Sequence, residues 1–292
     1  MTSTPNILCI GSVLWDIIGR ATPHMHVGSD VPGRITRLPG GVAMNIAMAL
    51  KAYGLQPALL STVGQDTEGD DLIAACTRMG MITEHIYRSQ DLPTDRYMAV
   101  EGGNGLIAAI ADAHSLEAAG AKILKPLLEG ALRGWNKIIA LDGNLTLSLL
   151  EDIADNAAFE AADLRIAPAS PGKAERLTPF LSHPRATIYL NLEEADIILH
   201  GKFDDSASAA DALLARGLYR VLVTDGAGPA TVATASEVIT LTPPEVLVTR
   251  VTGAGDTFMA AHIAAEAKGG SGAQALQTAL DAAATYISGE TY

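Results

Sequence analysis

The sequence predicts an α/β fold, in which helices cover both sides of a central and mostly parallel β-sheet. Short apolar runs alternate with helix-like segments along the chain, an order of elements that is typical of such sheets. Aromatic residues make up 4% of the chain, while Ala, Gly, Leu and Ile are frequent. This composition favours helices packed closely on a parallel sheet over a β-sandwich.

Each predicted strand is a short apolar run that suits a buried position in a sheet. In chain order, the predicted strands are Ile7–Gly11, Ala58–Val63, Lys137–Leu141, Leu164–Ala167, Ala186–Leu190 and Arg220–Val223. The predicted helical segments are Val42–Tyr53, Asp70–Met79, Leu147–Ala158, Ala207–Arg216, Thr257–Lys268 and Ala273–Ile287. In the first helix, Val42, Ile46, Leu50 and Tyr53 fall on one face, as packing on a sheet requires.

Two stretches do not fit this alternation and predict a small additional sheet. In Thr94–Asp112, two strand-like runs flank the Gly-rich turn Glu101–Gly105, as in a β-hairpin. The other stretch is Ile18–Leu38. We expect the segments at about 18–38 and 94–112 to form a small β-sheet lid across the strand ends. Because no repeat or low-complexity segment interrupts the pattern, we expect residues 1–292 to form one domain.

Composition and charge limit the function and the location. The net charge of −13 argues against binding to nucleic acid or to an anionic membrane surface, since both need patches of Lys and Arg. Cys9 and Cys76 lie in apolar surroundings without metal-ligand spacing, and we expect them to be reduced core residues. The first residues show neither a basic region nor a small-residue cleavage site, and no apolar run reaches membrane-spanning length, so we expect a cytoplasmic protein.

The segment Val251–Phe258 places a carboxylate behind three small residues, where an apolar helix begins. The backbone N–H groups of Gly253, Ala254 and Gly255 and the positive end of the helix dipole form a candidate anion hole for a phosphate. A phosphate repels Asp256, so a carboxylate here indicates a group that orients or deprotonates the attacking nucleophile. The segment therefore indicates a kinase. The alternative is a glycine-rich turn with Asp256 as a helix cap.

A second glycine-rich site lies at Pro39–Asn45. Gly40 and Gly41 precede a helix, and Asn45 falls one turn inside it, where its amide can point toward whatever the glycine backbone approaches. An amide carries both a donor and an acceptor, which suits sugar hydroxyls. The alternative is a helix that begins with two glycines and exposes Asn45 to solvent.

Together, the two glycine motifs resemble the PfkB (ribokinase-like) family of carbohydrate and nucleoside kinases. Asp16 follows the first strand as the sugar-binding Asp of that family does. The segment from Asn191 to Glu194 is similar to the Asn-x-x-Glu motif that the family places near the metal and phosphates. The resemblance runs from about residue 6 to about residue 287, and four motifs in the right order are more specific than a lone glycine motif.

The resemblance implies a ribokinase-like three-layer sandwich and a kinase that uses ATP and Mg²⁺. It implies that Asp256 is the base that takes the proton of the acceptor hydroxyl. With an ordinary pKa of about 4, this carboxylate would be ionised at neutral pH. The other implied residues are the acceptor-binding Asp16, Gly40, Gly41 and Asn45, the nucleotide-binding Asn191, Thr224 and Gly226, and Glu194, which acts on Mg²⁺ through water.

Within this family, the chain most resembles bacterial pseudouridine kinases. The likeness is local and involves the glycine site at Pro39–Asn45, the hairpin at 94–112, Asp142-Gly143-Asn144 and Pro168–Lys173. It implies that the acceptor is the 5′-hydroxyl of pseudouridine. Ribose, fructose and adenosine kinases share the scaffold and stay as alternatives, as does a catalytically silent sugar-binding protein. A Rossmann-type oxidoreductase is disfavoured because the first strand is not followed by G-x-G-x-x-G.

Three departures from the family pattern bear on the cofactors. Arg250 stands where relatives often have an acidic or amide residue in a monovalent-cation loop, which leaves potassium activation open. Gly228-Pro229 changes the usual spacing of glycine in the ATP loop, so the choice of ATP over another phosphoryl donor rests on the family resemblance. His262 takes a helix position that is usually apolar, and we interpret it as a core or surface residue without a catalytic role.

The remaining expectations concern the partners and the strand ends. We expect a small-molecule nucleoside or sugar and a nucleotide as partners, and we leave open a homodimer through the lid. Lys173 and Arg96 are expected to be solvated at the surface. Asp112, Asp142 and Asn144 sit at strand ends, where ligands often bind.

Overall fold

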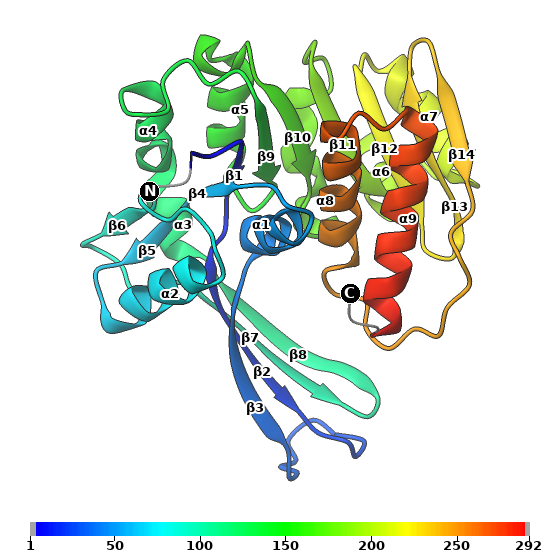
Figure 1. Ribbon diagram of the computed structural model, residues 1–292. Helices are drawn as coiled ribbons and strands as arrows, with labels where there is room; N and C mark the ends of the chain where they lie inside the picture. The colour runs from blue at the N-terminus through cyan, green and yellow to red at the C-terminus, as the bar shows by residue number, and fades with distance from the viewer. Residues whose placement is uncertain (1–3, 290–292) are drawn as a thin grey trace.

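A computed structural model describes residues 4–289 of the chain. An eight-stranded sheet lies between two layers of helices, and a small four-stranded sheet projects away from these layers (Figure 1). From edge to edge, the large sheet contains β14 (Val238–Leu241), β13 (Gly228–Thr234), β12 (Arg220–Asp225), β11 (Ala186–Asn191), β10 (Asp163–Ala167), β9 (Ile138–Asp142), β1 (Ile7–Ile10) and β4 (Pro57–Leu60). All neighbouring strands pair in parallel except β12 with β13 and β13 with β14.

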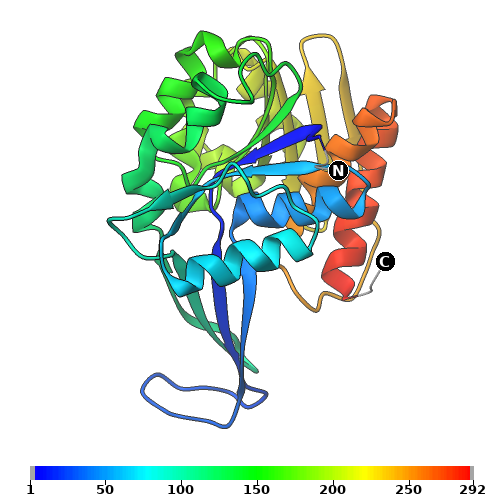
Figure 2. The ribbon, with the colours of Figure 1, turned by 60° about the vertical axis from the view of Figure 1, so that its left-hand side comes forward.

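The small sheet has the order β3-β2-β7-β8, and the second view shows how far it stands out from the body (Figure 2). Its strands are β2 (Leu14–Arg20), β3 (Arg34–Gly40), β7 (Arg96–Gly102) and β8 (Gly105–Asp112). Strands β5 (Thr62–Gly64) and β6 (Tyr87–Ser89) pair separately as a two-stranded sheet. The small sheet therefore begins at Leu14 and includes Gly40, while its action as a lid stays a prediction.

Helices cover both faces of the large sheet. One layer contains α1 (Val42–Ala52), α2 (Thr67–Arg78), α8 (Ala254–Ala267) and α9 (Gly272–Ser288). The other contains α3 (His114–Ala119), η1 (Gly120–Leu124), α4 (Lys125–Leu128), α5 (Leu147–Asp155), η2 (Ala157–Phe159), η3 (Pro171–Phe180), α6 (Leu192–Leu199) and α7 (Ser206–Ala215). Strand β1 shows why there are two cores, because Leu8 and Ile10 face one layer while Ile7 and Cys9 face the other.

These findings confirm the predicted α/β fold with a mostly parallel sheet and helices on both sides. One predicted strand was wrong in its extent. The run Ala58–Val63 is divided at Ser61, because β4 joins the large sheet and β5 pairs with β6. Cys9 and Cys76 are free and buried, as expected. Within residues 4–289, no helix combines the length and the hydrophobicity that crossing a bilayer requires.

Candidate active site

The candidate site lies at the edge of the large sheet where its parallel strands end, and α8 begins there. Gly253 is the N-cap of α8, with φ at 89°, in the left-handed region that favours glycine. A Cβ atom at this position would lie 2.6 Å from the Tyr286 hydroxyl oxygen of α9. Glycine is therefore required at 253 both by the turn and by the close approach of α9.

At this end of the helix, the N–H groups of Gly255 and Asp256 are better candidates for binding an anion than the N–H group of Ala254. The N–H of Ala254 already donates to the carbonyl oxygen of Val251 at 3.0 Å. Gly255 and Asp256 occupy the second and third positions of the helix, whose N–H groups have no acceptor within the helix. Ala254 can contribute to an anion hole only if its bond to Val251 breaks.

Asp256 is half-buried at the start of α8, and its carboxylate is held by α1. The side-chain amide of Asn45 donates to its Oδ2 atom at 3.0 Å. Burial raises the pKa of Asp256 to about 7; the bond from Asn45 lowers it, and the charges of Asp142, Asp16 and Glu194 raise it further. The expectation of an ordinary pKa was therefore wrong, because this carboxyl group is poorly solvated and surrounded by like charges.

Asp16 lies in β2 beside Gly40, the last residue of β3. A Cβ atom at Gly40 would lie 2.0 Å from an Asp16 carboxylate oxygen, so the two residues are in direct contact. Burial raises the pKa of Asp16 to about 6. Asp16 and Asp256 are thus two poorly solvated carboxyl groups that face the same region, since the charge of Asp16 also raises the pKa of Asp256.

Gly41 and the start of α1 rest on Ser12, a residue that the sequence analysis did not single out. Gly41 has φ at 93°, and a Cβ atom there would lie 2.5 Å from the Ser12 carbonyl oxygen. The N–H of Val42 donates to the Ser12 hydroxyl at 2.9 Å, and the N–H of Met44 donates to its carbonyl oxygen at 3.3 Å. Ser12 therefore caps α1 from outside the helix and supports the segment that carries Asn45.

Asp142 anchors Ser12 in turn. Asp142 ends β9 and is fully buried, and its Oδ2 atom accepts the Ser12 N–H at 2.8 Å and the Ser12 hydroxyl at 2.5 Å. The N–H of Asn144 donates to Asp142 Oδ1 at 2.7 Å. The ammonium group of Lys173 donates to Asn144 Oδ1 at 2.5 Å, and Lys173 is half-buried. The prediction that Lys173 is solvated at the surface was therefore wrong. Arg96 is exposed in β7, as expected.

Asn191 and Glu194 form a capping box at the start of α6. The N–H of Glu194 donates to Asn191 Oδ1 at 2.8 Å, and the N–H of Asn191 donates to Glu194 Oε2 at 2.8 Å. Burial raises the pKa of Glu194 to about 7, and the adjacent charge of Glu193 raises it further. The bonds give both residues a structural role, and they leave Glu194 as a buried acidic group near Asp256.

Thr224 and Gly226 lie at the hairpin between β12 and β13. Asp225 pairs with Gly228 across the turn, and Gly226 has φ at 54°. The hydroxyl of Thr224 donates to the Leu190 carbonyl oxygen at 3.4 Å, which ties the end of β12 to β11. The turn brings these residues to the same edge of the sheet as Asn191, since β11 and β12 run in parallel.

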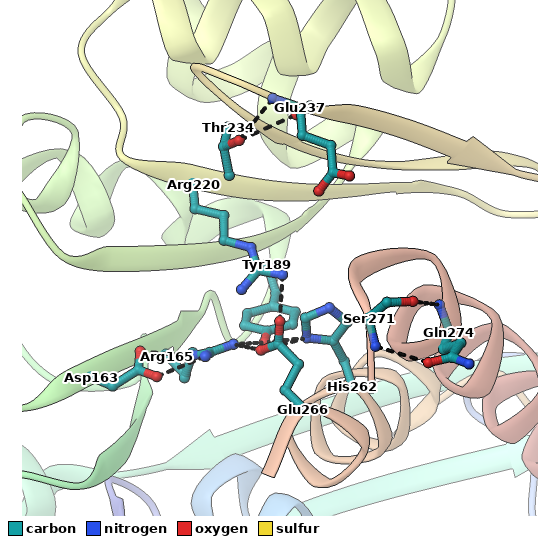
Figure 3. A network of polar contacts seen from close by, with 10 residues as sticks. All are labelled: Asp163, Arg165, Tyr189, Arg220, Thr234, Glu237, His262, Glu266, Ser271 and Gln274. Atoms are coloured by element: carbon teal, nitrogen blue, oxygen red, sulfur yellow. Dashed lines mark hydrogen bonds and ion pairs between the residues drawn. The ribbon is translucent and has the colours of Figure 1, made fainter. Parts of the chain in front are cut away.

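Polar bonds also hold α8 at its other end (Figure 3). Glu266 accepts bonds from Arg165 of β10 at 2.5 Å and from Arg220 of β12 at 2.6 Å. His262 is fully buried and shares a hydrogen bond of 2.9 Å with the Tyr189 hydroxyl. Burial lowers the pKa of His262 to about 3, so its ring is neutral. His262 is therefore a core residue, one of the two interpretations proposed from the sequence.

The loop before α8 is fastened to α9. The guanidinium group of Arg250 lies 3.8 Å from the centre of the Tyr286 ring and donates to the Tyr286 carbonyl oxygen at 2.7 Å. The Tyr286 hydroxyl donates to the Thr252 carbonyl oxygen at 2.9 Å.

Among the described residues, no three His, Cys, Asp or Glu side chains converge in the way that direct binding of a metal ion requires. A metal at this site would need ligands from water or from a substrate.

Comparisons with known proteins identify the family to which this fold belongs. The family model described as pfkB family carbohydrate kinase matches residues 4–290, and the chain therefore belongs to the pfkB family of carbohydrate kinases. Members of this family are phosphotransferases, and so is this chain.

Three relatives show how similar the chain is to individual proteins. It is 30% identical to a pseudouridine kinase of Escherichia coli over 87% of this chain and 81% of the relative. It is 28% identical to YeiI, an uncharacterized sugar kinase of the same organism, over 76% of this chain, but spans only 61% of that protein. The ribokinase of Arabidopsis thaliana, solved with ribose and ATP, superposes with a TM-score of 0.77 at 19% identity over 98% of this chain and 93% of that structure.

Proposed function

We propose that this chain uses ATP and Mg²⁺ to phosphorylate the 5′-hydroxyl of a nucleoside, and that the nucleoside is pseudouridine. The observation that carries the proposal is the Asn45–Asp256 contact, which fixes a carboxylate of raised pKa at the N-terminus of α8. The identity to the E. coli pseudouridine kinase supports the choice of nucleoside.

Asp256 would act as the general base. A base works best when its pKa lies near the working pH, and about 7 meets that condition. Its position matters as much, because a loose phosphoryl-transfer transition state requires a well-placed acceptor oxygen. The bond from Asn45 fixes the carboxylate on one side and leaves its other oxygen, Oδ1, for the acceptor hydroxyl.

Charge on the transferred group would be held by the first turn of α8. The amides of Gly255 and Asp256 and the positive end of the helix dipole favour the phosphoryl oxygens. The acceptor would bind between Asp16 and Asn45, with the backbone of Gly40 and Gly41 close against it. A carboxylate can accept bonds from two ribose hydroxyls at once.

The residues present suit a magnesium ion held through water. Glu194, Asp16 and Asp256 are poorly solvated acids with raised pKa values, and the charges of the first two raise the pKa of the third. A divalent cation between such groups and the phosphates would offset this repulsion. When bound, Mg²⁺ would neutralise charge on the ATP phosphates, with Asn191 and Glu194 holding its water ligands.

The nucleotide would lie against the hairpin at Thr224 and Gly226 and the start of α6 at Asn191. The fold shared with the ribokinase that was solved with ATP supports ATP as the donor. Arg250, in the loop before α8, is engaged with the carbonyl oxygen of Tyr286.

The small sheet supports a further part of the proposal, a homodimer through the lid. One of its faces carries a row of apolar side chains, since the register aligns Ile17 with Met98 and Met98 with Ile110, and Arg37 lies beside Ile17 at the end of this row. Ile110 and Ile35 on that face are 69% and 77% exposed. Contiguous apolar surface of this kind marks an interaction site. Light scattering of the purified protein tests whether two copies associate.

A competition assay tests the choice of acceptor. Pseudouridine, uridine, adenosine, ribose and fructose are supplied at equal concentration with ATP and Mg²⁺, and products are quantified. Pseudouridine presents one more ring N–H donor than uridine, and a polar group paired to that donor is left unsatisfied by uridine, which favours pseudouridine by about 1–3 kcal/mol. Earlier consumption of ribose or fructose contradicts the pseudouridine assignment. If none of the five acceptors is phosphorylated, the result supports the alternative of a catalytically silent sugar-binding protein.

A further inference from the structure

The base of the small sheet is joined to the rest of the protein around one buried carboxyl group, that of Asp95. Asp95 lies directly before β7 and is 4% exposed. Its Oδ1 atom accepts the N–H of Ser115 at 2.9 Å, and its Oδ2 atom accepts the N–H of Leu116 at 2.9 Å. Both donors lie in α3, shortly after β8 leaves the small sheet. The carboxylate therefore joins the point where the chain enters the hairpin to the point where it leaves.

The main chain of Asp95 also reaches β2. The N–H of Trp15 donates to the Asp95 carbonyl oxygen at 3.2 Å, next to the first residue pair of the parallel ladder between β2 and β7. The residue after Trp15 is Asp16, which pairs with Tyr97 in that ladder. The main chain of Asp95 therefore holds the start of the pairing between β7 and the strand that carries Asp16.

Neighbouring residues fix Asp95 from the other side. The N–H of Thr94 donates to Asp66 Oδ2 at 2.8 Å, and its hydroxyl donates to Asp66 Oδ1 at 2.6 Å. Asp66 in turn caps α2. The Ser115 hydroxyl donates to the Pro93 carbonyl oxygen at 2.5 Å. Residues 93–95 are thus held by polar bonds from α2, α3 and β2.

Away from its base, the small sheet is attached to α2 through Arg37 of β3, whose guanidinium group lies 3.3 Å from Glu68 and 3.3 Å from Asp71 in exposed ion pairs. Most residues of β8 are exposed, and the ion pair between Arg20 and Glu101 near its far end is solvent-accessible. Exposed pairs of this kind contribute little to stability. The orientation of the small sheet is therefore set mainly at its base.

We propose that Asp95 is a positioning residue for the acceptor: it fixes the base of the small sheet and thereby holds Asp16 against the site that contains Asp256. This inference rests on the proposed role of Asp16 in binding the acceptor. Asp95 itself does not touch the acceptor, and its effect is transmitted through the bond to Trp15.

The test variant is Asp95→Asn, assayed with the acceptor that the competition assay identifies. An amide keeps the size of the side chain but offers one acceptor oxygen to two N–H donors. We expect the acceptor KM to rise about tenfold, while kcat and the KM for ATP stay within about twofold, because loss of one bond to a charged group is of this size. The milder variant Ser115→Ala, which loses only the bond to Pro93, raises the acceptor KM by about threefold.

The matched control is Asp205→Asn. Asp205 caps α7 by accepting the Ser208 N–H at 2.7 Å, and α7 packs against α6, β12 and β13, away from the small sheet. This variant changes the same chemical group at another helix cap, and we expect the acceptor KM to be unchanged. An equal rise in the KM for ATP and for the acceptor with Asp95→Asn would indicate general loss of structure and would overturn the proposal.

Hydrogen exchange supplies a readout that does not depend on activity. In the protein without substrates, Asp95→Asn should speed exchange of the amides of Ser115, Leu116 and β2 relative to those of α9. Unchanged exchange in β2 overturns the positioning role even if the acceptor KM changes. If the wild-type protein phosphorylates none of the five acceptors, the proposed function fails while the exchange measurement still decides the role of Asp95.

Discussion

The side-chain amide of Asn45 in α1 donates to the carboxylate of Asp256 in α8 at 3.0 Å, although 211 positions separate the two residues in the chain. The contact joins the glycine segment that precedes α1 to the glycine segment that precedes α8. Because a hydrogen bond to a carboxylate favours its ionised form, Asn45 both orients Asp256 and lowers its pKa.

Removal of this bond should change the pH dependence of turnover. In Asn45→Ala the pKa of Asp256 rises above about 7, and the midpoint of the kcat–pH profile moves upward by about one pH unit. Activity should therefore fall more at pH 7 than at pH 9. The control Asn156→Ala removes an amide that caps η2, and its midpoint should match that of the wild type. Identical profiles for Asn45→Ala and the wild type would show that Asp256 does not govern the rate.

The raised pKa of Asp256 also predicts an effect on stability. Between its unfolded pKa of about 4 and its folded pKa of about 7, the native state binds more protons than the unfolded state, so stability falls as pH rises through this range. Asp256→Asn removes this penalty and should raise the free energy of unfolding at pH 8 by about 1 kcal/mol or more, with no gain below pH 4.

Chemical denaturation at several pH values measures this difference. Asp205→Asn is the control of opposite sign, because hydrogen bonds from Ser208 lower the pKa of Asp205 and its charge stabilises the native state above pH 4. An Asp256→Asn variant that is less stable than the wild type at pH 8 would contradict the burial of an ionised group at this site.

Closure of the small sheet over the acceptor should be visible by hydrogen exchange. If residues 94–112 and part of 18–38 act as a lid, a bound acceptor slows exchange of their amides more than that of the surface helix α7, because closure excludes water from the reacting groups. ATP analogue alone serves as the control ligand. Equal exchange in this region with and without acceptor would remove the lid from the mechanism.

The elements of the fold could largely be read from the sequence because each depends on local pattern. The strands and helices predicted around Ile7, Val42 and Thr257 exist within a few residues of their predicted ends. Helix α6 was missed, although Asn191 and Glu194 carry the capping-box signal at its start. The break at Ser61 could not be read, because an apolar run does not show which of two sheets each half will join.

The site was predictable to the extent that its residues stand in glycine-rich motifs. Asp256, Gly40 and Asn45 were singled out for this reason. Ser12 was missed because its partner Asp142 lies 130 positions away, and Asp95 was missed because its partners are backbone donors that no pattern marks. The raised pKa of Asp256 likewise depends on burial and on distant carboxylates, which only the folded chain brings together.

The most direct test of the central claim is turnover and acceptor binding in Asp256→Asn. An amide keeps the shape of the side chain but cannot take the acceptor proton, so kcat should fall by about 10²–10⁴-fold. The dissociation constant of the acceptor, measured by calorimetry without turnover, should stay close to that of the wild type. Turnover that remains above about a tenth of the wild-type value would show that Asp256 is not the base.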